Sequence, residues 1–67
     1  MSIFYRRIKE LREENNLTQK ELASKLGVSN STVCDWEKGR SQPDLETLKR
    51  IACFFEVKTD YLLGLED

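Results

Sequence analysis

Residues 19–36 have the sequence QKELASKLGVSNSTVCDW, and this stretch decides the fold. Its apolar residues recur with the period of a helix, which predicts two short helices over residues 18–26 and 29–37. Gly27 lies between them, where glycine adopts a positive φ at little cost. Ala23 is small enough for the second helix to cross closely over the first. The pattern therefore predicts a helix-turn-helix, two helices joined at a steep angle by a tight turn.

The same periodicity extends outward in both directions and predicts three further helices, over residues 3–15, 44–55 and 59–63. Polar residues with capping ability stand before four of the five helices. The predicted N-cap residues are Thr18, Ser29, Asp44 and Thr59. The apolar faces of the five helices are expected to pack together around one core, and they consist of Phe4, Ile8, Leu11, Leu22, Ala23, Leu26, Val33, Trp36, Leu45, Leu48, Ile51, Ala52, Phe55 and, on the fifth helix, Leu62 and Leu63. We therefore expect an all-α fold in which residues 1–67 form a single compact five-helix domain.

Length and composition exclude several classes of protein. A chain of 67 residues holds at most one domain, and 39% hydrophobic residues are too many for disorder. Its apolar runs are all far shorter than a membrane span requires. No apolar stretch follows Arg6 and Arg7, so we predict no secretory signal. Cys34 and Cys53 are accordingly expected to be reduced thiols in the cytoplasm.

The sequence lacks the residue combinations that commonly form enzyme active sites. There is no histidine, no cysteine spacing typical of a metal site, no nucleophile next to a base and no glycine-rich phosphate loop. We therefore expect no enzymatic activity, no cofactor, no metal and no small-molecule ligand.

The sequence resembles the Cro-type, phage-repressor-like helix-turn-helix family, often called XRE, in a series of segments that occur in the same order along the chain. The matching segments are RIKELR (7–12), LTQKELA (17–23), LGVS (26–29), WEKGR (36–40), Pro43, LETL (45–48) and YLLG (61–64). They cover roughly residues 5–64. The resemblance implies a lambda-repressor-like fold that binds double-stranded DNA, with the helix over 29–37 in the major groove.

The resemblance also implies which residues contact DNA. Gln19 and the loop residues Lys38 and Arg40 are expected beside phosphates, and so are Ser29, Thr32 and Ser41. The outer face of the recognition helix is expected to contact bases through Asn30, Ser31, Cys34 and Asp35. Without the resemblance, all of these residues are equally compatible with an ordinary solvated surface.

Three positions call for separate predictions. Arg12 and Glu37 lie at the edges of their helices' apolar faces, and the family pattern implies a partly buried ion pair between them. Cys34 departs from the family, which commonly has a polar residue there. Glu56 stands where Gly or Asn commonly ends the fourth helix, which predicts local strain or a different helix exit.

Net charge and apolar residues near the C-terminus bear on partners. The net charge of −1 is unlike the basic surface of most DNA-binding domains, although residues 1–40 hold 8 basic and 6 acidic side chains. The acidity and Asp35 keep an alternative open, an antitoxin-like or anti-repressor module that binds protein.

The C-terminal part of the chain holds more apolar residues than so small a core can bury, namely Leu62, Leu63, Leu65 and Phe54. They predict a homodimer through the fifth helix and the C-terminal tail, on a palindromic operator.

Overall fold

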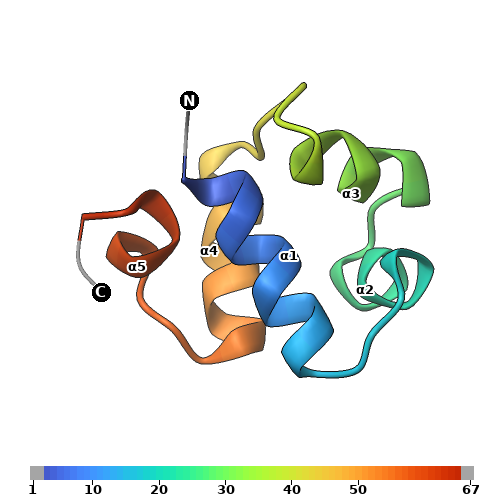
Figure 1. Ribbon diagram of the computed structural model, residues 1–67, viewed down its shortest axis with the longest axis horizontal. Helices are drawn as coiled ribbons and strands as arrows, with labels where there is room; N and C mark the ends of the chain where they lie inside the picture. The colour runs from blue at the N-terminus through green and yellow to red at the C-terminus, as the bar shows by residue number, and fades with distance from the viewer. Residues whose placement is uncertain (1–2, 66–67) are drawn as a thin grey trace.

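The computed structural model describes residues 3–65, and within that range it contains five helices and no strand. The helices are α1 (Phe4–Glu14), α2 (Gln19–Leu26), α3 (Asn30–Glu37), α4 (Leu45–Phe55) and α5 (Thr59–Leu63). Helix α1 crosses in front of α4, with α2 and α3 on one side and α5 on the other (Figure 1). Each predicted helix agrees with its observed counterpart to within one residue at both ends, and the all-α fold class is confirmed.

Side-chain caps begin three of the helices as predicted. Thr18 and Glu21 form a complete capping box: the Thr18 hydroxyl accepts from the Glu21 amide at 3.0 Å, and the Thr18 amide donates to the Glu21 carboxylate at 2.8 Å. Ser29 and Asp44 accept from the amide three residues ahead, at 3.1 and 2.8 Å. These bonds satisfy backbone donors that a helix cannot pair internally.

The predicted cap at Thr59 is wrong. Lys58 is the N-cap residue of α5, no side-chain cap bond is made there, and Thr59 is already the first helical residue. Pairing within the helix begins one residue early, because the Leu62 amide donates to the Lys58 carbonyl.

The core lies where α1, α2, α3 and α4 meet, with one residue contributed by α5. The buried apolar side chains among the described residues are Phe4, Ile8, Leu11, Leu22, Ala23, Leu26, Val33, Trp36, Ile51, Ala52 and Leu62. The rings of Phe4 and Trp36 meet edge to face with centroids 6.4 Å apart, which is a favoured aromatic geometry.

Leu45 is a wrong core prediction, because its side chain is 85% exposed. It is the first residue of α4, and Cα–Cβ bonds in a helix tilt towards the N-terminus. The Leu45 side chain therefore extends past the end of α4, whereas Leu48 and Phe55 on the same stripe pack against the core. Leu63, one of the C-terminal apolar residues that are too many for the core, is 46% exposed, whereas Leu62 beside it is buried.

Two helices are followed by a non-glycine residue with a positive φ. Asn16 has a φ of 58° after α1, and Glu56 has a φ of 57° at the C-cap of α4. The left-handed conformation at Glu56 is the strain predicted from the sequence, because a residue with a Cβ tolerates this region less readily than glycine.

Helix α5 and the glycine that follows it contact α1 and its N-cap residue Ile3. The Arg7 guanidinium donates to the Tyr61 carbonyl and lies 4.2 Å from the centroid of the Tyr61 ring. A Cβ added to Gly64, at the end of α5, would collide with the side chain of Ile3.

Among the described helices, none has both the length and the apolar content that a membrane crossing requires.

Candidate nucleic-acid interface

The turn between α2 and α3 holds the two helices at a fixed angle. Gly27 is left-handed, with a φ of 72°, and the Val28 amide donates back to the Ala23 carbonyl at 3.0 Å. Val28 then packs partly into the core, while Leu22 and Val33 on the facing sides of the helices are fully buried. The buried side of α3 is thereby fixed against α2, and its opposite side is left at the surface.

The exposed side of α3 displays the residues predicted to contact bases. Asn30 and Ser31 are exposed at the N-terminal end, and Cys34 and Asp35 follow one turn later and are half-buried. The structure therefore brings all four residues to one helix, with the two most accessible at the end that would enter a groove first.

Three hydroxyl groups meet at the start of α3. The Ser29 Oγ lies 2.7 Å from Thr32 Oγ1 and 3.1 Å from Ser31 Oγ, and it also accepts from the Thr32 amide. Ser29 is thus the helix cap, and its hydroxyl is already bonded within the protein. Any phosphate contact by Ser29 or Thr32 would share these groups with the cap.

The predicted ion pair between Arg12 and Glu37 is confirmed. Arg12 Nε lies 2.6 Å from Glu37 Oε2, and Nη2 donates to Oε1 at 3.0 Å, so the contact is bidentate. The two side chains are only 12% and 4% exposed. Arg12 also donates to the Leu17 carbonyl at 2.8 Å. The hydrogen bond to Glu37 raises the pKa of Arg12 above its ordinary value, against the opposing effect of burial.

Gln19 belongs to the same group, which the sequence did not reveal. Its amide nitrogen donates to Glu37 Oε1 at 3.0 Å, across 18 residues of sequence. One carboxylate at the end of α3 therefore joins α1 and α2. The Gln19 amide has a second hydrogen, so a phosphate contact remains a prediction that adds to this positioning role.

The loop after α3 presents cations beside the recognition face. Lys38, Arg40 and Ser41 are exposed around Gly39, which has a φ of 74°. The Arg40 amide donates to the Asp35 carbonyl at 2.9 Å, so the start of this loop is fixed to α3. Two cations next to an exposed polar helix face are suited to a polyanion.

Residues 8–62 match the family described as Helix-turn-helix. The chain belongs to this helix-turn-helix family. The resemblance to its XRE type is confirmed, and α2 and α3 are the two helices of the motif.

Solved and curated members of the helix-turn-helix family resemble the chain over nearly all of its length. The P22 c2 repressor, solved in complex with a synthetic operator, superposes with a TM-score of 0.89 at 27% identity, over 98% of this chain and 100% of that one. An uncharacterised HTH-type regulator of Methanocaldococcus jannaschii is 44% identical over 61 residues, which are 91% of this chain and 92% of that protein.

A longer helix-turn-helix relative is the HTH-type transcriptional activator BcrR of Enterococcus faecalis, 42% identical over 64 residues. The match covers 96% of this chain and 31% of BcrR. The chain therefore spans about a third of that relative, and the similarity concerns one part of it.

Proposed function

We propose that the chain binds double-stranded DNA in a sequence-specific manner and thereby regulates transcription. The observation that supports this most directly is that α3 packs on α1 and α2 through its buried side and leaves a polar face exposed. A major groove about 12 Å wide accepts a helix presented in this way. The similarity to a repressor solved on its operator supports the same use of the fold.

We propose that the chemistry of each interface residue determines whether it contacts a base or a phosphate. Asn30 has a donor and an acceptor in the geometry that matches the N7 and N6 of adenine. Asp35 only accepts when ionised, so it favours cytosine N4 and opposes guanine. Ser31 and Cys34 lie beside them, while Gln19, Ser29, Thr32, Lys38, Arg40 and Ser41 contact phosphates.

Repression is the form of regulation that we propose. The P22 c2 repressor matches over the whole of its solved chain, whereas the activator BcrR matches over only 31% of its length. A domain that occupies a site needs only its own DNA affinity to block transcription. We place this action in the cytoplasm and assign it no chemical reaction, cofactor or small-molecule ligand.

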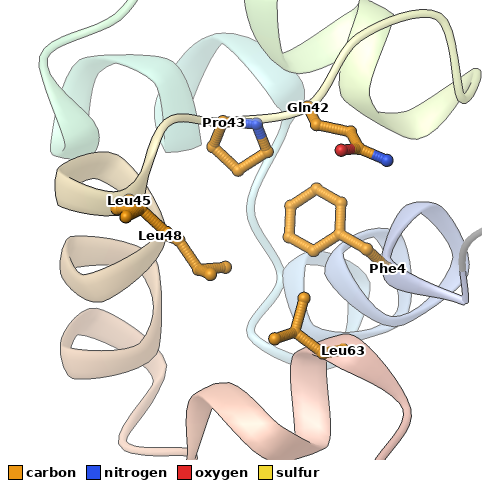
Figure 2. Close-up of a pocket in the computed structure, with 6 residues that line it drawn as sticks. All are labelled: Phe4, Gln42, Pro43, Leu45, Leu48 and Leu63. Carbon is orange, nitrogen blue, oxygen red and sulfur yellow. The ribbon is translucent and has the colours of Figure 1, made fainter.

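We propose that the chain binds its operator as a two-fold homodimer. Leu45, Leu63 and Leu65 are 85%, 46% and 73% exposed, and Leu45 and Leu63 face an apolar groove (Figure 2). The groove is lined by Phe4, Gln42, Pro43, Leu45, Leu48 and Leu63. Of the predicted C-terminal tail, residues 66 and 67 lie outside the described residues. A second copy that covers this apolar surface would place the recognition helices on palindromic half-sites about one helical turn apart.

Selection from a random duplex library tests the proposed function. We expect a palindromic motif to be enriched, and we expect sedimentation to show two chains per operator. Leu63→Asp should give a monomer that still folds, while Lys49→Ala serves as a control that makes the same change of net charge at an exposed position. Failure to enrich any sequence would contradict DNA binding and favour the alternative protein-binding module. One chain per operator would contradict the dimer.

A further inference from the structure

Arg50 reaches from α4 to the end of α2. Its Nη2 donates to the carbonyl of Leu26 at 2.7 Å, across 24 residues of sequence. Leu26 is the last residue of α2, and carbonyls in the last turn of a helix have no partner within the helix. A cation is favoured at this end by the helix dipole. Arg50 therefore caps α2 from another element of the fold.

The capped carbonyl immediately precedes the turn of the helix-turn-helix. A Cβ added to Gly27 would lie 3.3 Å from Arg50 Nη2, so the guanidinium also lies against the turn itself. The Val28 amide bonds back to Ala23, and Ser29 then caps α3. Movement of the Leu26 carbonyl would be passed directly to the first residues of α3, because only Gly27 and Val28 lie between Leu26 and Ser29.

The position of α3 depends on α2 more than on α4. Helix α3 packs chiefly on α2 and α1, and a loop from Lys38 to Asp44, exposed except at the half-buried Pro43, connects it to α4. The hydrogen bond from Arg50 joins α4 directly to the end of α2 where α3 begins. It thus connects the part of the molecule that carries the proposed dimer groove to the part that carries the recognition face.

We propose that Arg50 is a positioning residue for DNA binding: it fixes the α2–α3 turn, and with it the angle of the recognition helix, without touching DNA. This inference rests on the proposed function. It differs from the phosphate contacts assigned above, because the guanidinium is directed to a carbonyl of its own chain.

Four proteins test it: wild type, Arg50→Met, Arg50→Lys and the neighbouring control Lys49→Met, which removes the same charge from an exposed position. DNA affinity is measured on the selected operator at several salt concentrations, well below each melting temperature. Amide hydrogen exchange of Gly27 and Val28 is measured in the free proteins, so one readout does not depend on DNA.

For Arg50→Met we expect about threefold to tenfold weaker binding and a similar acceleration of exchange at Gly27 and Val28, since a hydrogen bond to a charged group is lost at a partly exposed site. The salt slope should stay that of the wild type. Arg50→Lys should restore part of both effects, because an ammonium also donates to a carbonyl, and Lys49→Met should leave exchange unchanged.

Three results would overturn the proposal. A salt slope lowered by about 1 in Arg50→Met, beyond the change in Lys49→Met, would make Arg50 a phosphate contact. A lower melting temperature with unchanged affinity would make it merely structural. Unchanged exchange at Gly27 and Val28 would show that it does not hold the turn. If the wild type itself binds no DNA, the proposed function fails, and the exchange data still decide whether Arg50 fixes the turn.

Discussion

Removal of either partner of the Arg12–Glu37 pair should destabilise the domain severely. The pair is bidentate, with its side chains 12% and 4% exposed, so water gives little compensation to a partner left alone. Breaking a buried pair on one side costs about 3–5 kcal/mol. Arg12→Met leaves Glu37 with Gln19, whereas Glu37→Met leaves Arg12 with the Leu17 carbonyl. We expect both single variants to fall in this range, with Arg12→Met the worse because Glu37 is the more buried.

The double variant should recover most of the loss. Two Met side chains fill similar volume without a buried charge, and such replacements are often close to neutral. Leu17 and Gln19 still lose a partner each, at roughly 1 kcal/mol apiece. We therefore expect the double variant to lie about 1–3 kcal/mol below the wild type. The coupling energy between Arg12 and Glu37 should then be about 3 kcal/mol or more.

Urea denaturation followed by fluorescence measures this cycle, because Trp36 is the only tryptophan and is 2% exposed. A domain of this length has a total stability of roughly 3–10 kcal/mol, so the single variants approach unfolding. An osmolyte such as TMAO keeps all four proteins in a measurable range. Each single substitution should lower the melting temperature by about 12–40 °C, since each kcal/mol corresponds to about 4–8 °C in a domain of this length. Strict additivity of the two single changes would refute the reasoning, since it would show that neither side chain depends on the other.

Three further predictions concern the DNA face and the helix caps. Lys38→Ala with Arg40→Ala should weaken binding about equally on all sequences and lower the salt slope by about 1 per lost phosphate contact; an unchanged slope would exclude both residues from the interface. Asp35→Ala should relax the base preference at one position, removing a mismatch penalty of about 1–3 kcal/mol, and binding-site selection that returns the wild-type motif would contradict this. The pKa of the Glu21 carboxyl is lowered by hydrogen bonds from Thr18, chiefly from its backbone amide. The pKa of the Asp44 carboxyl is lowered by hydrogen bonds from Thr47, first from its side chain and then from its amide. Both ionised carboxylates should therefore stabilise the domain above their ordinary pKa range, and this stabilisation should be lost as the pH falls through the lowered pKa values. The free energy of unfolding of Asp44→Asn should accordingly change less with acidic pH than that of the wild type.

Local sequence patterns were sufficient to predict the helices. The capping box at Thr18 and the glycine at position 27 determine helix ends through contacts within a few residues, which the sequence shows directly. The burial predicted for Leu45 is wrong because periodicity shows which face of a helix is apolar but not how far along that face the neighbouring helices extend. Thr59 was misplaced because a good capping residue type does not exclude a cap one position earlier.

Contacts between distant residues were accessible only in part. The Arg12–Glu37 pair was predicted because the family pattern relates the two positions. The bonds from Gln19 to Glu37 and from Arg50 to Leu26 join segments 18 and 24 residues apart. Each depends on the exact distance between packed helices, and neither a glutamine nor an arginine on a helix surface indicates a partner by its type. The two residues with the clearest positioning geometry were thus the ones that residue patterns alone treat as ordinary surface.

Different residues of the short helix α3 stabilise the fold and are proposed to determine base preference. Val33, Trp36 and Glu37 face inward, where the first two fill the core and the third joins α1 and α2. Asn30 and Asp35 face outward, and neither serves as a cap or an ion-pair partner that the fold requires. Because the outer residues take no part in the core or in the group formed by Glu37 with Arg12 and Gln19, a change of base preference should be possible at the outer positions without loss of the fold. A change at Glu37 should instead alter affinity on every sequence, since it releases the helix that presents all of the outer residues.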